Sequence, residues 1–376
     1  MAAARVAPGP PAPGDRVARS AATGERVDAA GIDAAGIDAA AIGAVRRADR
    51  RRRVAVVLVG AGLAAAIALA ALSFGAAGVT PDRVLSVLLG GGERIDRFVV
   101  FELRLPRILA ALVVGVAFAL AGAVFQSTLR NPLASPDILG ISAGASLGAV
   151  WALLGLGAGG AIVAGFAFGG GLVVAVVIWL AAWRQGLHGV RFVLVGVGMA
   201  YLCGSTVAWL LARAEVREAQ TALHWTVGSV ADVRGDQLWL LAVGTAACAV
   251  VLAFLTRALR PLALGDDHAR ALGVRADAAR VALLVVAVAL VALATSVAGP
   301  IAFVALIAPA VARRLVGHGG AALGAAAVVG GVLTLGADVA GQFAIPGFTA
   351  PLGIVTGVIG APYLLWLLAR TERTRA

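Results

Sequence analysis

From residue 54 onward, long apolar stretches alternate with short polar connectors. The first stretch, Val54–Phe74, holds 21 residues without a charged side chain, which is enough for a helix to cross roughly 30 Å of hydrocarbon. This pattern recurs to the end of the chain and predicts about ten membrane-spanning helices in an all-α polytopic membrane protein. The later spans are expected at about 105–127, 138–156, 161–183, 192–212, 237–256, 281–298, 300–312, 321–340 and 351–369.

The charges in the connectors predict which ends of the spans face the cytoplasm. Six arginines between residues 46 and 53 precede the first span, and an excess of arginine marks the cytoplasmic side. The connectors 75–104 and 213–236 mix acids with arginines and fit the outside, whereas 257–280 carries five arginines and fits the cytoplasm. Further arginines follow residue 369, so both termini are predicted to be cytoplasmic.

The uncharged segment 281–312 is too long for one span, and Arg313 and Arg314 after it place both of its flanks in the cytoplasm. We therefore expect the chain to cross outward and return, turning at the Gly299–Pro300 step. Each arm is short and Pro309 interrupts the second. The resulting broken helix is tolerated only against protein or beside a water-filled path.

Composition excludes a soluble protein. Of the 376 residues, 61% are hydrophobic and 14% are charged, against about 25% charged residues in a soluble domain. The net charge of +11 comes from arginines that flank apolar stretches, so it does not indicate nucleic-acid binding. None of the 31 basic residues is a lysine, and a Walker A loop needs one to reach the nucleotide phosphates. We therefore expect no enzyme, and any ATP hydrolysis on a partner.

Residues 1–53 differ from the rest of the chain. They are rich in alanine, glycine and proline, and the pentad Gly-Ile-Asp-Ala-Ala occurs twice. Such a segment buries too little apolar surface to offset its ordering entropy. We predict a disordered cytoplasmic tail over 1–53, ending in the arginine cluster, and a transmembrane domain over 54–376.

Neither the cysteines nor the histidines predict a metal site or a cofactor. Cys203 and Cys248 both lie in apolar stretches, where buried thiols are the ordinary interpretation. The four histidines are scattered along the chain and lack the spacing of metal ligands.

Arg104 and Arg107 stand at the predicted outer end of the second span, in the sequence Arg-Leu-Pro-Arg. Two interpretations are open from the residues alone. The guanidinium groups either extend to lipid headgroups, or they anchor an acidic partner, because arginine offers a fixed fork to a carboxylate.

A polar break separates the second and third spans. It contains Gln126, then Asn131, Pro132 and Leu133, and Asn131 is the only asparagine in the chain. Two interpretations are open. The break is either an ordinary turn on the inner side of the membrane, or backbone held open beside a transport pathway.

The cytoplasmic connector between the sixth and seventh spans contains a short helical pattern over Leu264–Val274. An aspartate is expected to cap this helix, and Gly273 to end it in a left-handed conformation. This is the best candidate surface through which a separate ATPase pushes on the membrane domain. Its residues are Leu264, Gly265, Asp266, Asp267, Ala271, Leu272 and Gly273.

Asp338 lies near the predicted outer end of the ninth span, followed by Gln342. An acid in a membrane segment is a candidate proton carrier. The more ordinary interpretation is a solvated side chain or a cap of the next helix.

The order of these blocks resembles the FecCD-type permease subunits of ATP-binding-cassette (ABC) importers for iron–siderophore complexes and vitamin B12. The resemblance covers about residues 54–370. It implies a type II importer permease of ten helices in the cytoplasmic membrane of a bacterium. It also implies three kinds of protein partner: a second permease subunit, two ATPase subunits, and an extracytoplasmic substrate-binding protein.

The resemblance also assigns roles to residues. Arg104 matches an arginine that pairs with an acid of the binding protein, with Arg107 beside it. The 264–274 connector matches the ATPase coupling helices, and Asn131 and Leu133 match the inner closure of the pathway. With Gln126 and Pro132, the last two form the expected gate.

Two residues depart from the family pattern. Ala310 stands where a histidine is usual, and Gln342 where a second docking arginine is common. A neutral glutamine cannot form an ion pair, so we expect a heterodimer in which the sister permease supplies the missing charge. Iron–siderophore import is the favoured activity, and cobalamin or haem import is the alternative. An ion-coupled secondary transporter, with Asp338 as its acid, is the rival class.

Overall fold

The computed structural model describes residues 39–74, 79–137, 139–182, 189–317, 321–345 and 347–373. The chain divides into two compact units, Met1–Arg51 and Arg52–Ala376. The second unit contains all the predicted spans.

The described residues are helical throughout, with no β-strand among them, so the predicted all-α class is confirmed. Ten helices correspond to the ten predicted spans: α2 (Ala39–Ser73), α5 (Leu105–Thr128), α6 (Ile141–Leu156), α7 (Ala161–Ala182), α8 (Gly189–Arg213), α10 (Gly235–Leu264), α12 (Ala276–Ala298), α13 (Val304–Val316), α14 (Leu323–Phe343) and α15 (Leu352–Arg373). Short helices lie in the connectors: α3 (Pro81–Leu88), α4 (Arg94–Phe98), the π-helix η1 (Val99–Arg104), α9 (Val216–Val227) and α11 (Asp266–Ala271).

Seven helices within the described residues are long and apolar enough to cross a membrane. The others are short: α6 has 16 residues and α13 has 13, and the apolar part of α15 is Leu352–Leu367. The membrane character is thus confirmed, while the count of ten spans stays a prediction.

The first helix begins earlier than the sequence indicated. It starts at Ala39 rather than at Val54 and runs without a break through the arginine cluster. Alanine and arginine have high helix propensity, and a helix that already spans the membrane extends through them at little cost. The remainder of the predicted disordered tail, residues 1–38, lies outside the described residues.

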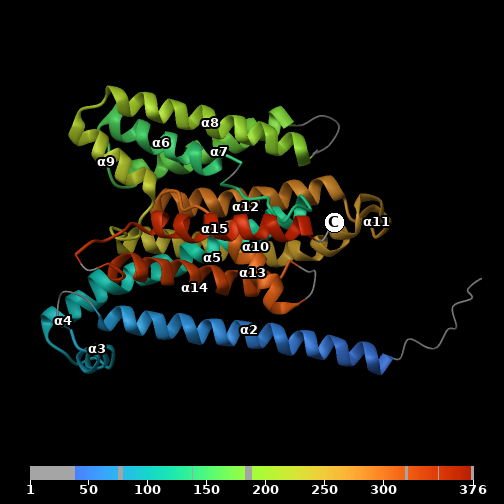
Figure 1. The fold of residues 1–376 in the computed structure, drawn as a ribbon, viewed down its shortest axis with the longest axis horizontal. Helices are drawn as coiled ribbons and strands as arrows, with labels where there is room; N and C mark the ends of the chain where they lie inside the picture. The colour runs from blue at the N-terminus through green and yellow to red at the C-terminus, as the bar shows by residue number, and fades with distance from the viewer. Residues whose placement is uncertain are drawn as a thin grey trace, which may run out of the picture. The chain divides into compact units, whose positions relative to one another are not determined.

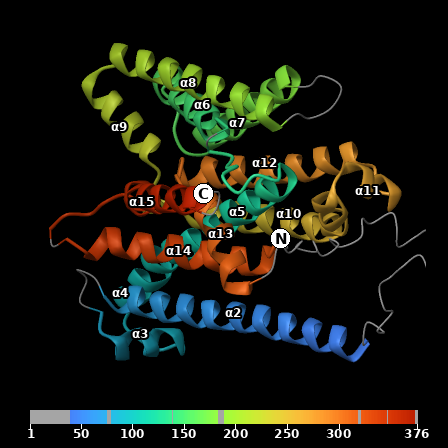
Figure 2. The same ribbon diagram turned by 45° about the vertical axis from the view of Figure 1, so that its right-hand side comes forward.

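Helix α5 forms the centre of the second unit. It packs against α10, α12, α13 and α14, and Figures 1 and 2 both show it surrounded by these helices. Two glycines permit the closest approaches, since a Cβ at Gly122 would collide with the Ala305 carbonyl of α13, and one at Gly115 with Gly330 of α14. Small residues at such crossings are the usual means of packing membrane helices tightly.

Helices α6, α7, α8 and α9 form a second group that lies beside this centre (Figure 1). Helix α12 joins the two groups, because it contacts α5 and α10 on one side and α6 and α7 on the other. Large apolar side chains on α2, α7, α8 and α10 remain exposed, as expected for helices that face lipid.

The predicted break at residues 299–300 is present. Helix α12 ends at Ala298, and α13 begins only at Val304, after Gly299 and Phe303 have both taken positive φ angles of 71° and 67°. The Ser229 amide donates to the Ala298 carbonyl at 2.7 Å, so the end of α12 is fixed against the segment that follows α9.

Candidate functional site

Arg107 and Asp338 form a buried ion pair between α5 and α14. The guanidinium donates twice, from Nε to Oδ2 at 2.9 Å and from Nη2 to Oδ1 at 2.8 Å, and the Asp338 side chain is only 1% exposed. The amide of Gln342 donates to Asp338 Oδ2 at 2.7 Å. The interpretation of Asp338 as a solvated or capping residue is therefore wrong, because helix packing brings two partners to it.

Arg104 lies one turn before Arg107 and has a different environment. Its Nη1 donates to the Leu72 carbonyl near the end of α2, and the residue is partly exposed. Of the two predicted docking arginines, Arg107 forms an ion pair with a carboxylate of its own chain, whereas within the described part of the chain Arg104 donates to a backbone carbonyl.

Gln126 is buried near the end of α5 and bridges to α13 in two ways. Its Nε2 donates to the Leu306 carbonyl at 3.1 Å and more weakly to the Ala305 carbonyl at 3.4 Å. Pro309 has no N–H, so the Ala305 carbonyl four residues earlier lacks its intrahelical donor, and the glutamine compensates. Gln126 Oε1 also accepts from Arg313 Nη2 at 2.7 Å.

The loop after α5 is held by its own polar groups. The Leu133 amide donates to Asn131 Oδ1 at 2.9 Å, which makes Asn131 a turn former. Arg130, at a positive φ of 50°, donates from Nη2 and Nε to the Leu262 carbonyl at 2.7 and 3.1 Å. Pro132 is exposed and Leu133 partly buried.

Those bonds bring two predicted sites together, because Leu262 lies two residues before the Leu264–Gly273 segment. The structure thus joins the loop that contains Asn131 to the end of α10, from which the candidate coupling segment continues. Sequence reasoning did not foresee this contact, which links residues 132 positions apart.

The candidate coupling segment presents two apolar side chains outward. Leu264 is 67% exposed and Leu272 is 63% exposed, on either side of α11. Gly265 and Gly273 take positive φ angles of 119° and 78°, so the predicted left-handed end at Gly273 is confirmed. Of the predicted aspartate caps, Asp267 does not cap α11 and instead lies 3.4 Å from Arg270. The Asp266 side chain lies outside the described residues, and Ala271 closes the helix.

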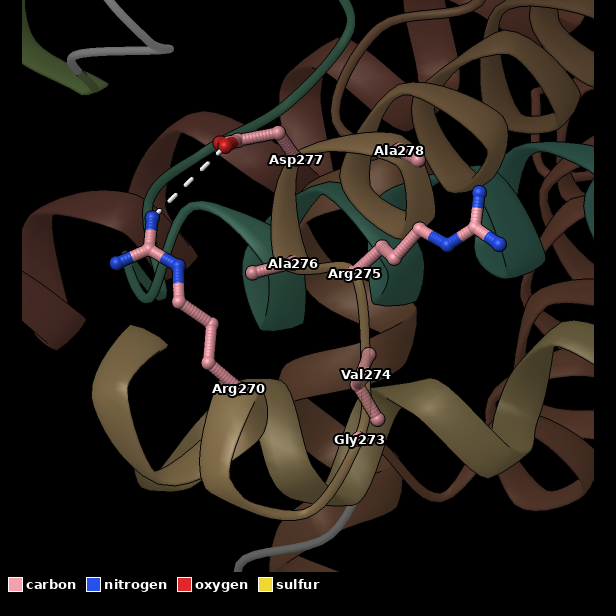
Figure 3. A pocket seen from close by; sticks show the side chains of 7 residues that line it. All are labelled: Arg270, Gly273, Val274, Arg275, Ala276, Asp277 and Ala278. Atoms are coloured by element: carbon pink, nitrogen blue, oxygen red, sulfur yellow. Dashed lines mark ion pairs between the residues drawn. The ribbon is translucent and has the colours of Figure 1, made fainter.

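A pocket of about 500 Å³ opens beside this segment. Figure 3 shows Arg270 and Asp277 facing each other across it, with 3.8 Å between Nη2 and Oδ2. Arg275 extends away from that pair (Figure 3). Three of the seven residues that line the pocket are charged, and the other four are glycine, valine and two alanines.

Asp137 is a partly buried carboxyl that sequence reasoning did not single out. It lies just before α6, where the Ser142 hydroxyl donates to Oδ1 at 2.7 Å and the Ser135 hydroxyl to Oδ2 at 3.4 Å. Burial raises the pKa of this carboxyl to about 6, and the two hydroxyl bonds oppose that rise. The Ser-Pro-Asp sequence just before the start of α6 could have indicated a carboxylate bonded to nearby hydroxyls.

Among the described residues, no group of three or more histidine, cysteine or acidic side chains is placed to hold a metal ion. Cys203 and Cys248 are both free thiols.

Comparison with known proteins identifies the family. The model of the FecCD transport family matches residues 62–370. The chain belongs to the FecCD transport family. It is 38% identical over 304 residues to the ferric enterobactin transport system permease protein FepG of Escherichia coli (strain K12), covering 81% of this chain and 92% of that protein. The iron(3+)-hydroxamate import system permease protein FhuG of Bacillus subtilis (strain 168) is 33% identical, with 80% and 92% covered.

A solved structure supports the same assignment. The fold matches a metal-chelate type ABC transporter in an inward-facing conformation, with a TM-score of 0.75, 26% identity, and coverage of 84% of this chain and 99% of that chain. This FecCD protein is therefore a multi-pass permease subunit of the cytoplasmic membrane. It works with a separate ATPase and a substrate-binding protein.

Proposed function

We propose that this FecCD permease imports a ferric–siderophore complex. We base the substrate class on the relatives: one serves ferric enterobactin, another iron(3+)-hydroxamates, and a third, 36% identical over 85% of this chain, achromobactin. The chelate passes through a path between two permeases, driven by ATP hydrolysis on the partner. Cobalamin and haem are the alternative cargoes, to be tested against the same transporter.

We further propose ten spans with both termini in the cytoplasm. The seven long apolar helices account for most of the crossings. Helices α6, α13 and α15, whose apolar segments are shorter, complete the count, and each packs against other helices of the bundle. The arginines before the first span and after the last one support the orientation.

In this proposal, docking of the binding protein depends on Arg104. Arg107 is already neutralised by Asp338, and Gln342 donates to that same carboxylate. Neither is therefore available as a second docking charge. If this permease offers a single docking arginine, a sister permease must supply the other positive charges that hold the binding protein. This requirement supports a heterodimer.

The inner side supports a coupled gate. We assign the gate to Gln126, Asn131, Pro132 and Leu133, and ATPase contact to the segment Leu264–Gly273. The Arg130–Leu262 bonds join the gate loop to the end of α10, two residues before the coupling segment begins. A push on the coupling segment then shifts the gate loop, and the path opens to one side at a time.

The ion-coupled rival loses its main support. It needs a buried acid free to exchange protons or ions, and Asp338 was its candidate. That carboxylate accepts three short hydrogen bonds from Arg107 and Gln342. A compensated carboxylate in a packed helix interface is poorly suited to carry a coupling ion.

The test is purification of the tagged chain from its native membrane in mild detergent, followed by reconstitution. We expect an ATPase and a second, non-identical permease to co-purify, and radiolabelled ferric siderophore to enter proteoliposomes only with ATP and binding protein. A variant of the ATPase without its Walker A lysine is the matched control. Uptake driven by membrane potential in that control would reject the importer. A homodimer that still takes up substrate with ATP would reject the heterodimer but not the importer. Uptake of cobalamin or haem, but not of ferric siderophore, would reject only the proposed substrate.

A further inference from the structure

The connector between α2 and α5 carries an apolar surface that no other described part of the chain covers. Seven of its large hydrophobic side chains are 42–79% exposed: Leu85, Leu88, Leu89, Ile95, Phe98, Phe101 and Leu103. Large apolar side chains exposed in such number on one short segment indicate an interaction surface. The connector was expected to be an ordinary mixed-charge loop on the outside.

The connector is folded, and its charged groups hold it together. Arg97 donates from Nη2 to the Gly90 carbonyl at 2.7 Å and from Nε to the Gly91 carbonyl at 2.8 Å. Arg83 lies 3.8 Å from the buried Asp96. Of the seven charged side chains between residues 79 and 103, only Asp96 is buried and the other six are exposed. The surface of the connector therefore carries charged groups together with large apolar side chains, as an amphipathic segment does.

Chain continuity places this surface at the edge of a bilayer. The connector follows α2 and leads into α5. The apolar segments long enough to cross a membrane are Gly43–Ser73 and Arg94–Thr128, so the second of them already includes the last residues of the connector. Phe74, at the end of α2, is 66% exposed, and so are many apolar side chains along that helix. Large apolar side chains are thus exposed both at this end of α2 and on the connector.

The net charge of the connector argues against a protein partner that recognises it by electrostatic attraction. Between residues 79 and 103, three arginines face four acids, so the connector is nearly neutral. A docking face for an acidic binding protein needs a net positive charge. A nearly neutral amphipathic segment instead suits the boundary between headgroups and acyl chains, where apolar side chains enter the bilayer and charged ones remain at its surface.

We propose that residues 79–103 are an interfacial anchor whose partner is bilayer lipid. Leu88 and Leu89 of the α3 region and Ile95 of α4 enter the headgroup–acyl boundary at the end of α2 remote from the arginine cluster. This anchor holds the entrance of α5, and with it Arg104, at a fixed depth in the membrane. It rests on the membrane assignment of the chain and not on the proposed substrate.

The test is site-specific quenching in the assembled transporter. In a Cys203→Ser, Cys248→Ser background, single cysteines are introduced by Leu89→Cys and Ile95→Cys and labelled with an environment-sensitive fluorophore. The transporter is placed in nanodiscs of phosphatidylcholine with brominated acyl chains, and aqueous iodide is added separately. Glu93→Cys, an exposed polar position of the same connector, is the matched control. Leu63→Cys in α2 is the lipid-facing reference, and Leu88→Cys replaces Leu89→Cys if that variant does not assemble.

We expect labels at 89 and 95 to lose most of their fluorescence to brominated lipid, as at 63, and little to iodide. The label at 93 should show the opposite. Equal quenching by iodide at 89, 95 and 93 would overturn the anchor. Protection at 89 and 95 only after binding protein is added would reassign the surface to protein docking. Neither readout requires transport, so failure of the anchor is distinct from failure of the proposed function.

Discussion

Arg107 and Asp338 form a two-point ion pair across the interface of α5 and α14, with donor–acceptor distances of 2.8 and 2.9 Å. The two residues are 231 positions apart, and Gln342 adds a third bond to the same carboxylate. Arg107 therefore holds the bundle together, and the proposed docking role falls to Arg104 alone.

Asp338→Asn should destabilise the permease by about 3 kcal/mol, because removing one member of a buried pair leaves the other charge uncompensated. The measurement is thermal unfolding of the purified complex in detergent. Gln342→Ala removes one hydrogen bond and should cost only about 1 kcal/mol. The double variant Arg107→Met, Asp338→Leu should recover part of the loss; equal unfolding temperatures for all three proteins would contradict the structural role of the pair.

Arg104→Glu should reduce siderophore uptake at physiological salt while leaving basal ATPase activity unchanged, since it reverses the charge offered to the binding protein. The loss should appear as weaker binding of that protein, measured by its dissociation constant across a salt series, because charge-steered docking weakens as salt rises. Arg94→Glu, an exposed arginine of α4, is the control. Unchanged affinity in the Arg104→Glu protein would remove the docking assignment.

Gln126→Leu should uncouple ATP hydrolysis from uptake, so that more ATP is consumed for each chelate imported. The leucine fills the space but donates nothing to the Ala305 and Leu306 carbonyls and leaves Arg313 without its acceptor. The readout is the ratio of phosphate released to iron imported in proteoliposomes. Thr334→Val, at another buried α5–α14 bond, controls for a general loss of packing; the same ratio in both variants would mean that Gln126 is structural only.

Leu272→Asp should release the ATPase from the purified complex. Leu272 is exposed beside α11, and a charge there prevents burial in an apolar groove of the partner. Co-purification of the ATPase, quantified against the tagged permease, measures the effect. Val216→Asp, at another exposed apolar residue on α9, is the matched control at the proposed outer side. An intact complex in the Leu272→Asp protein would move the coupling contact elsewhere.

Asp137→Asn should change how stability depends on pH. The pKa of Asp137 is raised to about 6 in the folded state, so the folded state keeps its proton where the unfolded state has already released it. The wild-type protein should therefore lose stability as pH rises from about 4 to about 6 and stay level above that range. The asparagine variant lacks this titration, and its advantage in unfolding temperature should grow over the same range. A constant difference between the two proteins would show that the carboxyl does not titrate there.

Much of the fold follows from local patterns. The apolar stretches predicted every long helix, because a membrane span must satisfy its own backbone and needs only length and apolarity to do so. Gly299, Pro300 and Gly273 were likewise found at their predicted turns, since the restriction on φ belongs to each residue itself. The start of α2 at Ala39 was missed because composition was interpreted as disorder although the residues favour helix.

The sequence alone determined the all-helical membrane class, the positions of the apolar helices and, through the order of its motifs, the family. These depend on properties that each residue carries wherever it lies. Only the tertiary structure decided that Arg107 is paired with Asp338, that Gln126 compensates the gap left by Pro309, that Arg130 reaches Leu262, and that the 79–103 connector turns its leucines outward. Such contacts join residues up to 231 positions apart and depend on how the helices pack, which the pattern of apolar residues along the chain does not encode.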